Sequence, residues 1–245
     1  FKDMVCYQEE VRDPSRMAEV LNRVIEKAFR GSAPAQINVP RDYWTQVIDI
    51  ELPPIVRFER QGGGKEAIEN AAKLLSKAKF PVILSGAGVV LGGAIDECKK
   101  LAEKLDAPVC NGYQHNDSFP GSHPLAVGPL GYNGSKAAME LISKADVVLA
   151  LGTRLNPFST LPGYGIDYWP KKATIIQVDM NPDRIGLTKK VSVGICGDAK
   201  QVAQQILDKL SSDAGNTGRE ERKNLIHKTK SAWLQTLSGL DHEED

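Results

Sequence analysis

From residue 65 onward, the apolar positions alternate between short continuous runs and stripes with helical spacing. The first expected helix, over residues 65–78, carries Ile68, Ala71, Ala72 and Leu75 on one face. Further amphipathic helices are expected at 95–105, 135–145 and 199–210, and the apolar runs predict buried strands at 81–85, 107–110, 146–152, 173–179 and 191–195. Continuous apolar strands that alternate with amphipathic helices are typical of a parallel sheet covered on both faces. The pattern therefore predicts a doubly wound, mainly parallel α/β sheet.

A shorter α/β segment precedes this sheet. Asp13 and Pro14 provide an N-cap and a first-turn proline for a helix that Gly31 is expected to end, and residues 35–40 alternate like a strand. Paired prolines, mixed charges and three consecutive glycines then predict a linker. We therefore expect a partial α/β segment over residues 1–50, a linker over 51–64, the sheet domain over 65–212 and a charged helical segment over 213–245.

Charge and composition narrow the function classes. The chain has 31 Lys and Arg against 31 Asp and Glu, so no net field favours nucleic acid, anionic lipid or a polyanionic substrate. No apolar run approaches the length of a membrane span, and no secretory signal precedes the first helix. The four cysteines form neither a CxxC pair nor a metal-site spacing with histidine, which indicates reduced thiols. We expect a cytoplasmic protein without nucleic-acid or membrane partners.

Ligands of such sheets bind at the carboxyl ends of the strands, where glycine-rich loops are expected at 86–93, 111–134, 152–170 and 179–186. The first loop has Gly86 and Gly88, but Leu91 stands where the dinucleotide fingerprint needs its third glycine. The second strand also ends without the carboxylate that holds the cofactor ribose. A nicotinamide site is therefore not expected. The loop is either an anion cradle of backbone amides or a turn that needs only small residues.

Other loops offer further candidates. Gly131 precedes a helix as in a phosphate loop, but Ser135 before Lys136 reverses the Walker order, so an NTPase site is rejected and only backbone contact with a phosphate stays open. Arg154 can pair with a phosphate, and Asp179 at a strand end can accept both hydroxyls of a ribose. The alternative for both is a surface ion pair or a helix cap. The sequence shows no catalytic carboxylate pair, metal cluster or activated nucleophile.

Several stretches carry a family resemblance, in order and over essentially the whole chain: APAQINVPRDYW, PVILSGAGVV, LAEKLDAPV, HPLAVGPLGYNGSKAA, ADVVLALGTRL, IIQVDMNPDRIG and GICGDAK. They resemble the thiamine diphosphate-dependent enzymes of the acetolactate synthase type. The resemblance implies that residues 1–50 are the C-terminal part of a pyrimidine-binding domain, that 65–212 are the central Rossmann-like domain, and that 213–245 lead to a pyrophosphate-binding domain. It places the catalytic residues and the sites for thiamine diphosphate and Mg²⁺ outside this chain.

The central domain of such enzymes carries FAD, ADP or no nucleotide. The family's nucleotide contacts fall here on six residues: Gly86, Gly88, Gly131, Gly152, Arg154 and Asp179. This chain reads Gly-Thr-Arg-Leu-Asn-Pro-Phe where the flavin-binding members have Gly-x-Arg-Phe-Asp-Asp-Arg. Because both aspartates and the second arginine are missing, FAD is not expected, while an adenine nucleotide or coenzyme A stays open.

Within this family, YQHNDSFPGSHPL and LNPFSTLPGYGIDYWPK are similar to an acetyltransferase branch. That resemblance implies a homo-oligomeric enzyme, a dimer or tetramer, that converts sulfoacetaldehyde and phosphate to acetyl phosphate and sulfite, with the fragment alone inactive. The alternatives are another member such as acetolactate synthase, or a stand-alone nucleotide-binding or regulatory module. The C-terminal segment distinguishes the module from a fragment of a longer enzyme. If it is packed, it favours a self-contained module, and if it is loose, it favours a linker. The apolar residues whose burial decides this are Leu225, Ile226, Trp233 and Leu237.

Overall fold

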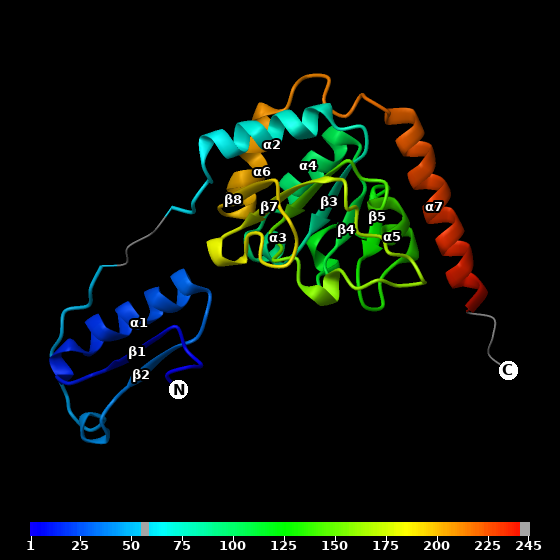
Figure 1. Cartoon of the computed structure of the whole chain (residues 1–245). Helices are drawn as coiled ribbons and strands as arrows, with labels where there is room; N and C mark the ends of the chain where they lie inside the picture. The colour runs from blue at the N-terminus through cyan, green and yellow to red at the C-terminus, as the bar shows by residue number, and fades with distance from the viewer. Residues whose placement is uncertain (55–58, 241–245) are drawn as a thin grey trace. The chain divides into compact units, whose positions relative to one another are not determined.

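A computed structural model of the protein describes residues 1–54 and 59–240. The chain divides into two compact units, Phe1–Glu59 and Arg60–Asp245 (Figure 1). Residues 55–58 of the expected linker and residues 241–245 of the expected C-terminal segment lie outside the described residues. The assignment of residue ranges to named enzyme domains stays a prediction, and each unit is described by itself.

The first unit is a β–α–β arrangement. Its elements are β1 (Tyr7–Glu10), η1 (Pro14–Arg16), α1 (Met17–Gly31), β2 (Ala35–Asn38) and η2 (Arg41–Tyr43). The two strands pair in parallel, and α1 packs on them through Val20 and Val24. Asp13 caps the first turn as expected, since its side chain accepts the backbone N–H of Ser15. The helix includes Gly31, and Ser32 rather than the glycine takes the left-handed conformation that ends it.

The second unit contains one sheet of six strands, all pairing in parallel in the order β5-β4-β3-β6-β7-β8. The strands are β3 (Pro81–Ser85), β4 (Val109–Asn111), β5 (Ala126–Pro129), β6 (Val147–Leu151), β7 (Thr174–Asp179) and β8 (Val193–Cys196). The α-helices are α2 (Lys65–Lys77), α3 (Ala87–Leu91), α4 (Ile95–Leu105), α5 (Lys136–Ile142), α6 (Ala199–Lys209) and α7 (Arg219–Leu240). The predicted α/β class with a parallel sheet is confirmed.

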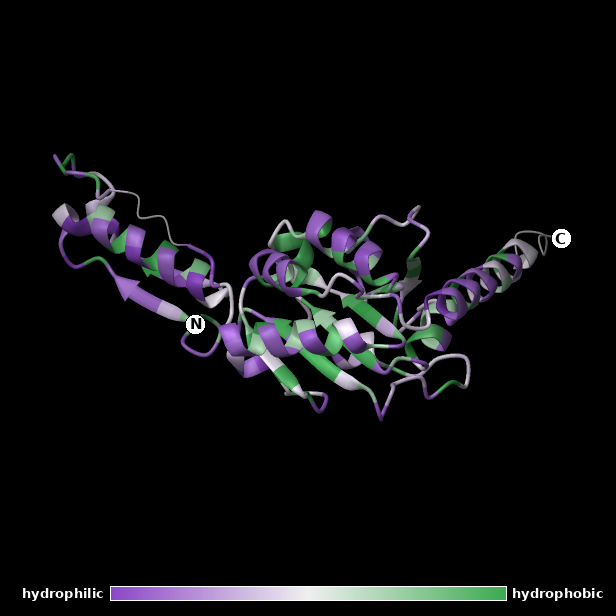
Figure 2. Cartoon of the chain, turned by 90° about the horizontal axis from the view of Figure 1, so that it is seen from above, coloured by the Kyte–Doolittle hydropathy of each residue, from purple (hydrophilic) through white to green (hydrophobic). Residues whose placement is uncertain are grey.

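The strand order explains how both faces of this sheet are covered. The chain passes from β3 to β4 in one direction, and from β5 back across to β6 in the other. Because such crossovers are right-handed, α4 and α5 lie on opposite faces. Helices α2 and α4 both contact α6, whereas α5 contacts α7. Apolar residues are concentrated on the strands between these layers (Figure 2), and β3 and β6 are buried throughout.

Two strands have no clear signal in the sequence. β1 has the polar sequence Tyr-Gln-Glu-Glu, which carries no pattern of apolar residues. In the structure its residues alternate between half-buried and exposed, as in a strand with one covered face. β5, Ala-Val-Gly-Pro, lies inside the glycine- and proline-rich stretch that was expected to be a loop. It is an edge strand, where a terminal proline is tolerated because one side needs no ladder hydrogen bonds.

The C-terminal helix α7 is packed over its first half. Ile226 and Thr229 are buried, and the Trp233 ring meets the Tyr164 ring edge-on at 5.5 Å between centroids. Leu234 and Leu237, farther along, are exposed. None of the described helices, α7 included, is long and apolar enough to cross a membrane. Of the four residues that were to distinguish a module from a linker, Ile226 is buried, Leu225 and Trp233 are half-buried and Leu237 is exposed, so the packing of α7 favours neither.

A buried arginine fastens α7 to the sheet unit. The side chain of Arg222 is 1% exposed, and burial lowers its pKa. Its five N–H groups all donate to backbone carbonyl oxygens at 2.6–2.9 Å, those of Lys79, Leu105, Asp106, Gly215 and Thr217. These acceptors lie just before β3, at the C-terminal end of α4 and in the turn before α7. Only a guanidinium has five donors in a fixed fork, so lysine cannot replace it.

We predict that Arg222→Lys lowers the free energy of unfolding by about 3 kcal/mol, because several buried carbonyl groups lose their donors. Urea denaturation followed by circular dichroism measures the change. The control is Lys223→Ala on the exposed side of the same turn, which should stay within about 0.5 kcal/mol of the parent chain. Equal stability of the two variants would contradict this role of Arg222.

Candidate functional site

The carboxyl end of the second sheet is the candidate ligand-binding edge. Strands β3 and β6 are neighbours, and their onward connections leave toward opposite sides of the sheet. Ligands of doubly wound sheets bind outside such a switch point. The loops that follow these two strands begin at Gly86 and Gly152, so the structure places both predicted glycines at this point.

Two glycine-containing segments pack directly against each other: the one after β3, with Gly86 and Gly88, and the one after β6, with Gly152. The N–H of Gly88 donates to the carbonyl oxygen of Gly152 at 2.8 Å. A Cβ on Gly88 would lie 2.7 Å from the Cα of Gly152, and a Cβ on Gly86 would lie 2.6 Å from the Cβ of Thr153. Gly152 also has a φ of +60°. The close approach of two backbones therefore accounts for all three glycines without a ligand, and nucleotide contact by them stays a prediction.

Gly131 has a similar explanation. Its φ is +84°, and a Cβ there would lie 1.8 Å from the carbonyl oxygen of Phe158. The next residue, Tyr132, donates its N–H to that same oxygen at 2.9 Å. The loop after β5 is thus fixed to the loop after β6. The backbone of Gly131 serves this junction, whether or not a phosphate also contacts it.

Arg154 and Asp179 are the predicted site residues with side-chain chemistry. Arg154 follows β6 and Asp179 is the last residue of β7; because these strands are adjacent, both residues lie at the carboxyl edge. Arg154 is exposed and makes no hydrogen bond or ion pair with any of the residues that the structure describes. Asp179 is 8% exposed, and its Oδ1 accepts the N–H of Asn181 at 2.9 Å. Neither alternative fits: Asn181 rather than Asp179 caps the next helical turn, through the N–H of Asp183, and Arg154 has no ion-pair partner among the described residues.

Three aromatic rings gather at the same edge. Tyr113 follows β4, Tyr132 follows β5, and Phe158 lies in the loop after β6. The centroid of the Tyr113 ring lies 6.1 Å from those of the other two rings, edge-on to Tyr132 and stacked with Phe158. Tyr132 and Phe158 are each 54% exposed. Sequence analysis missed this cluster, because β5 was expected to be part of a loop and Tyr132 was therefore not seen to follow a strand.

The polar loop HNDSFPGSHP is held by its own hydrogen bonds. Ser118 is fully buried, and its hydroxyl donates to the carbonyl oxygen of His115 at 2.8 Å. The Asn111 amide donates to the Ser118 Oγ at 2.9 Å.

Burial raises the pKa of the Cys98 thiol to about 12 and raises that of Cys110 as well, so neither is a thiolate at neutral pH. Among the described residues, no cluster of three or more His, Cys, Asp or Glu side chains could hold a metal.

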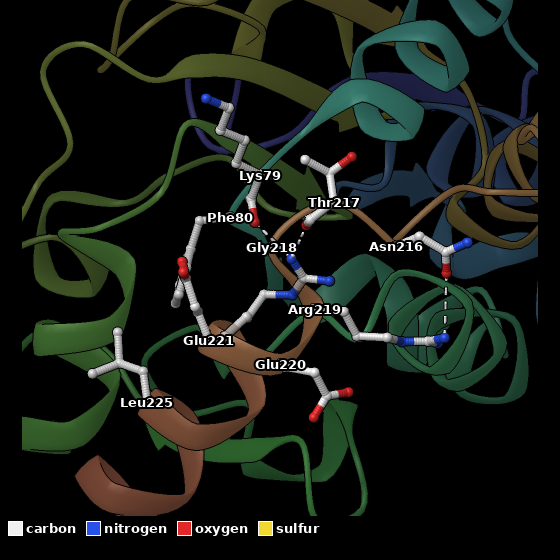
Figure 3. Close-up of a pocket in the computed structure, with 10 residues that line it drawn as sticks. Lys79, Phe80, Asn216, Thr217, Gly218, Arg219, Glu220, Glu221 and Leu225 are labelled. Carbon is white, nitrogen blue, oxygen red and sulfur yellow. Dashed lines mark hydrogen bonds between the residues drawn. The ribbon is translucent and has the colours of Figure 1, made fainter.

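The opposite end of the sheet has a cavity of about 810 Å³ beside the start of α7 (Figure 3). Lys79 and Phe80, which precede β3, line it together with Arg219 and Arg222. Both arginines are engaged, since Arg222 donates to five carbonyl groups and Arg219 pairs with Asp106. A cavity whose guanidinium groups are already paired belongs to the attachment of α7 rather than to ligand binding.

Comparison with known proteins identifies the family. Residues 68–206 match the family described as "Thiamine pyrophosphate enzyme, central domain". The chain is 79% identical over its full length to a "Probable sulfoacetaldehyde acetyltransferase" of Rhizobium meliloti (strain 1021), of which it covers 42%. A "Probable acetolactate synthase large subunit" of Methanocaldococcus jannaschii is 33% identical over 98% of the chain and 39% of that protein. The chain thus spans about two fifths of the relatives' length.

A solved structure agrees with the fold. Benzoylformate decarboxylase from Polynucleobacter necessarius superposes with a TM-score of 0.71 at 20% identity, over 87% of this chain and 40% of that one. This likeness concerns the fold alone, whereas the family match covers more than half of the residues. The chain belongs to the thiamine pyrophosphate enzymes, and the match lies in their central domain.

Proposed function

We propose that this chain is part of a sulfoacetaldehyde acetyltransferase, which converts sulfoacetaldehyde and phosphate to acetyl phosphate and sulfite. The observation that carries the proposal is the identity over all 245 residues with two relatives, 79% with one named "Probable sulfoacetaldehyde acetyltransferase" and 78% with one named "Sulfoacetaldehyde acetyltransferase". The identity to a relative named acetolactate synthase is 33%. We also propose a cytoplasmic homo-oligomer, dimeric or tetrameric, that takes part in sulfonate breakdown such as taurine degradation.

The described residues do not fit a site for thiamine diphosphate and Mg²⁺. Asp198 follows Gly197, but it is 1% exposed and its carboxylate is already used. It accepts the N–H groups of Lys200 and Gln201 at the start of α6 and pairs with Arg60 at 3.0 Å. The cofactor supplies covalent activation of carbonyl groups in this family. We propose that the parts of the enzyme that hold it lie outside this chain.

Two alternatives can be weighed against particular observations. The acetolactate synthase alternative rests on the 33% identity with the Methanocaldococcus jannaschii protein. The alternative of a stand-alone nucleotide-binding or regulatory module would agree with the packing of α7, whose Arg222 and Ile226 are buried, but that packing does not favour it. That packing is equally compatible with a longer enzyme, because a helix can be fastened at its start and still lead onward.

We predict that the full-length enzyme containing this chain releases sulfite from sulfoacetaldehyde when thiamine diphosphate, Mg²⁺ and phosphate are supplied. Acetyl phosphate should appear in equal amount, because the acetyl group passes to phosphate as sulfite leaves. Omitting phosphate is the control and should abolish acetyl phosphate formation. No sulfite release, or a purified enzyme with flavin absorbance that forms acetolactate from pyruvate, would overturn the assignment.

We further propose that the carboxyl edge of the sheet binds an adenine nucleotide or coenzyme A through Arg154 and Asp179. An exposed guanidinium without a partner among the described residues suits a diphosphate, and a carboxylate on the adjacent strand suits a ribose. The glycines Gly86, Gly88, Gly131 and Gly152 would add backbone contacts.

Isothermal titration of the full-length enzyme with ADP and with coenzyme A tests this ligand proposal. We predict that Arg154→Ala weakens binding by about 10- to 100-fold, the range expected for a charge-assisted hydrogen bond. Asp179→Asn should weaken binding as well, while it keeps an oxygen for the Asn181 N–H. Lys172→Ala, before β7 at the opposite end of the sheet, is the control and should bind like the parent. No measurable binding of either ligand would refute the proposal.

A further inference from the structure

The loops after β6 and β7 are joined by a side chain from within the sheet. Gln177 of β7 is 1% exposed, and its side-chain amide contacts both loops. Its Nε2 donates to the carbonyl oxygens of Thr153 and Arg184, both at 3.1 Å. Its Oε1 accepts the N–H of Gly186 at 2.8 Å. The side-chain amide of Gln177 therefore makes three hydrogen bonds, and all three go to backbone groups of the two loops at the candidate edge.

A second side chain joins the same loops two residues farther along each of them. The hydroxyl of Thr188 donates to the carbonyl oxygen of Leu155 at 2.7 Å. Leu155 has a φ of +54°, which a residue with a branched side chain rarely adopts. Its own side chain is fully buried. The surroundings of Leu155 therefore hold a backbone conformation that would not persist alone.

These contacts lie on either side of Arg154. Thr153 before it is held by Gln177, and Leu155 after it is held by Thr188 and by its buried side chain. Between two fixed neighbours, the exposed Arg154 side chain projects from a backbone with little freedom. We propose that Gln177, assisted by Thr188, is the positioning residue that presents Arg154 to an anionic ligand. The proposal rests on the ligand-binding role given to Arg154 above.

The chemistry of the position supports a role beyond filling space. Ile176 and Val178, on either side of Gln177 in β7, are buried and apolar, and burying an amide is unfavourable unless its hydrogen bonds are made. An apolar side chain of similar size would fill the same volume, but it would leave the Thr153 and Arg184 carbonyl groups and the Gly186 N–H without these partners. The amide is therefore explained by the connection that it makes between the loops.

Hydrogen exchange in the full-length enzyme without nucleotide tests the connection itself. Gly186 lies in an exposed loop, so the protection of its amide depends on the bond to Gln177. Gln177→Leu should raise exchange by about tenfold at Gly186 and in residues 153–155, and leave the other strands unchanged. Ile175→Val, two residues earlier on the same strand, is the matched control and should raise neither. Unchanged exchange in both loops of Gln177→Leu would overturn the proposal, whatever the ligand.

A double-mutant cycle with ADP as the probe tests the action through Arg154. Gln177→Leu should weaken ADP binding by about three- to tenfold, and the same change in an Arg154→Ala background should weaken it by less than about twofold. Thr188→Val, at an exposed residue that does not endanger the core, should give a smaller loss that also disappears in that background. Equal losses with and without Arg154 would contradict a positioning role. Absence of ADP binding by the parent enzyme would refute the ligand class, while the exchange experiment still decides the connection.

Discussion

The close approach of Gly88 and Gly152 is the constraint on which the candidate edge depends. These residues follow β3 and β6, the neighbouring strands at the switch point, and their backbones touch where a Cβ on either residue would collide. The hydrogen bond from the Gly88 N–H to the Gly152 carbonyl oxygen holds α3 against the loop after β6. That loop carries Arg154 and Phe158, so the position of the exposed groups at the edge follows from a contact between two glycines.

Further contacts extend this constraint across the sheet. The loop after β5 is fixed to the loop after β6 through Gly131 and Phe158, and the loop after β7 is fixed to it through Gln177. The protein thus orders this edge by its own hydrogen bonds and packing. A ligand that binds there would meet a site already formed, which lowers the entropic cost of binding. The chain supplies this scaffold, whereas the proposed acetyl transfer depends on groups outside it.

The sequence predicts the parts of the fold that repeat a simple pattern. Buried strands such as β3 and β6 are continuous apolar runs, and α2 and α4 carry regular apolar stripes, so both kinds of element were predicted. β1 and β5 were missed because one is polar and the other is short and contains glycine and proline. Arg222 stands in a run of charged residues that looks like solvated surface, and Gln177 is one polar residue inside an apolar strand. Their roles depend on carbonyl groups far away in the sequence, which no local pattern reveals.

The unfolding free energy of Gly88→Ala, measured without any ligand, tests most directly whether internal packing fixes this edge. Gly88 has an ordinary negative φ, so the substitution adds a collision without backbone strain. Gly121→Ala is the matched control, because a Cβ at Gly121 meets nothing within 4 Å. The account predicts a loss of about 1–3 kcal/mol for Gly88→Ala and less than about 0.5 kcal/mol for the control. Equal stability of the two variants, with nucleotide binding lost only in Gly88→Ala, would contradict it.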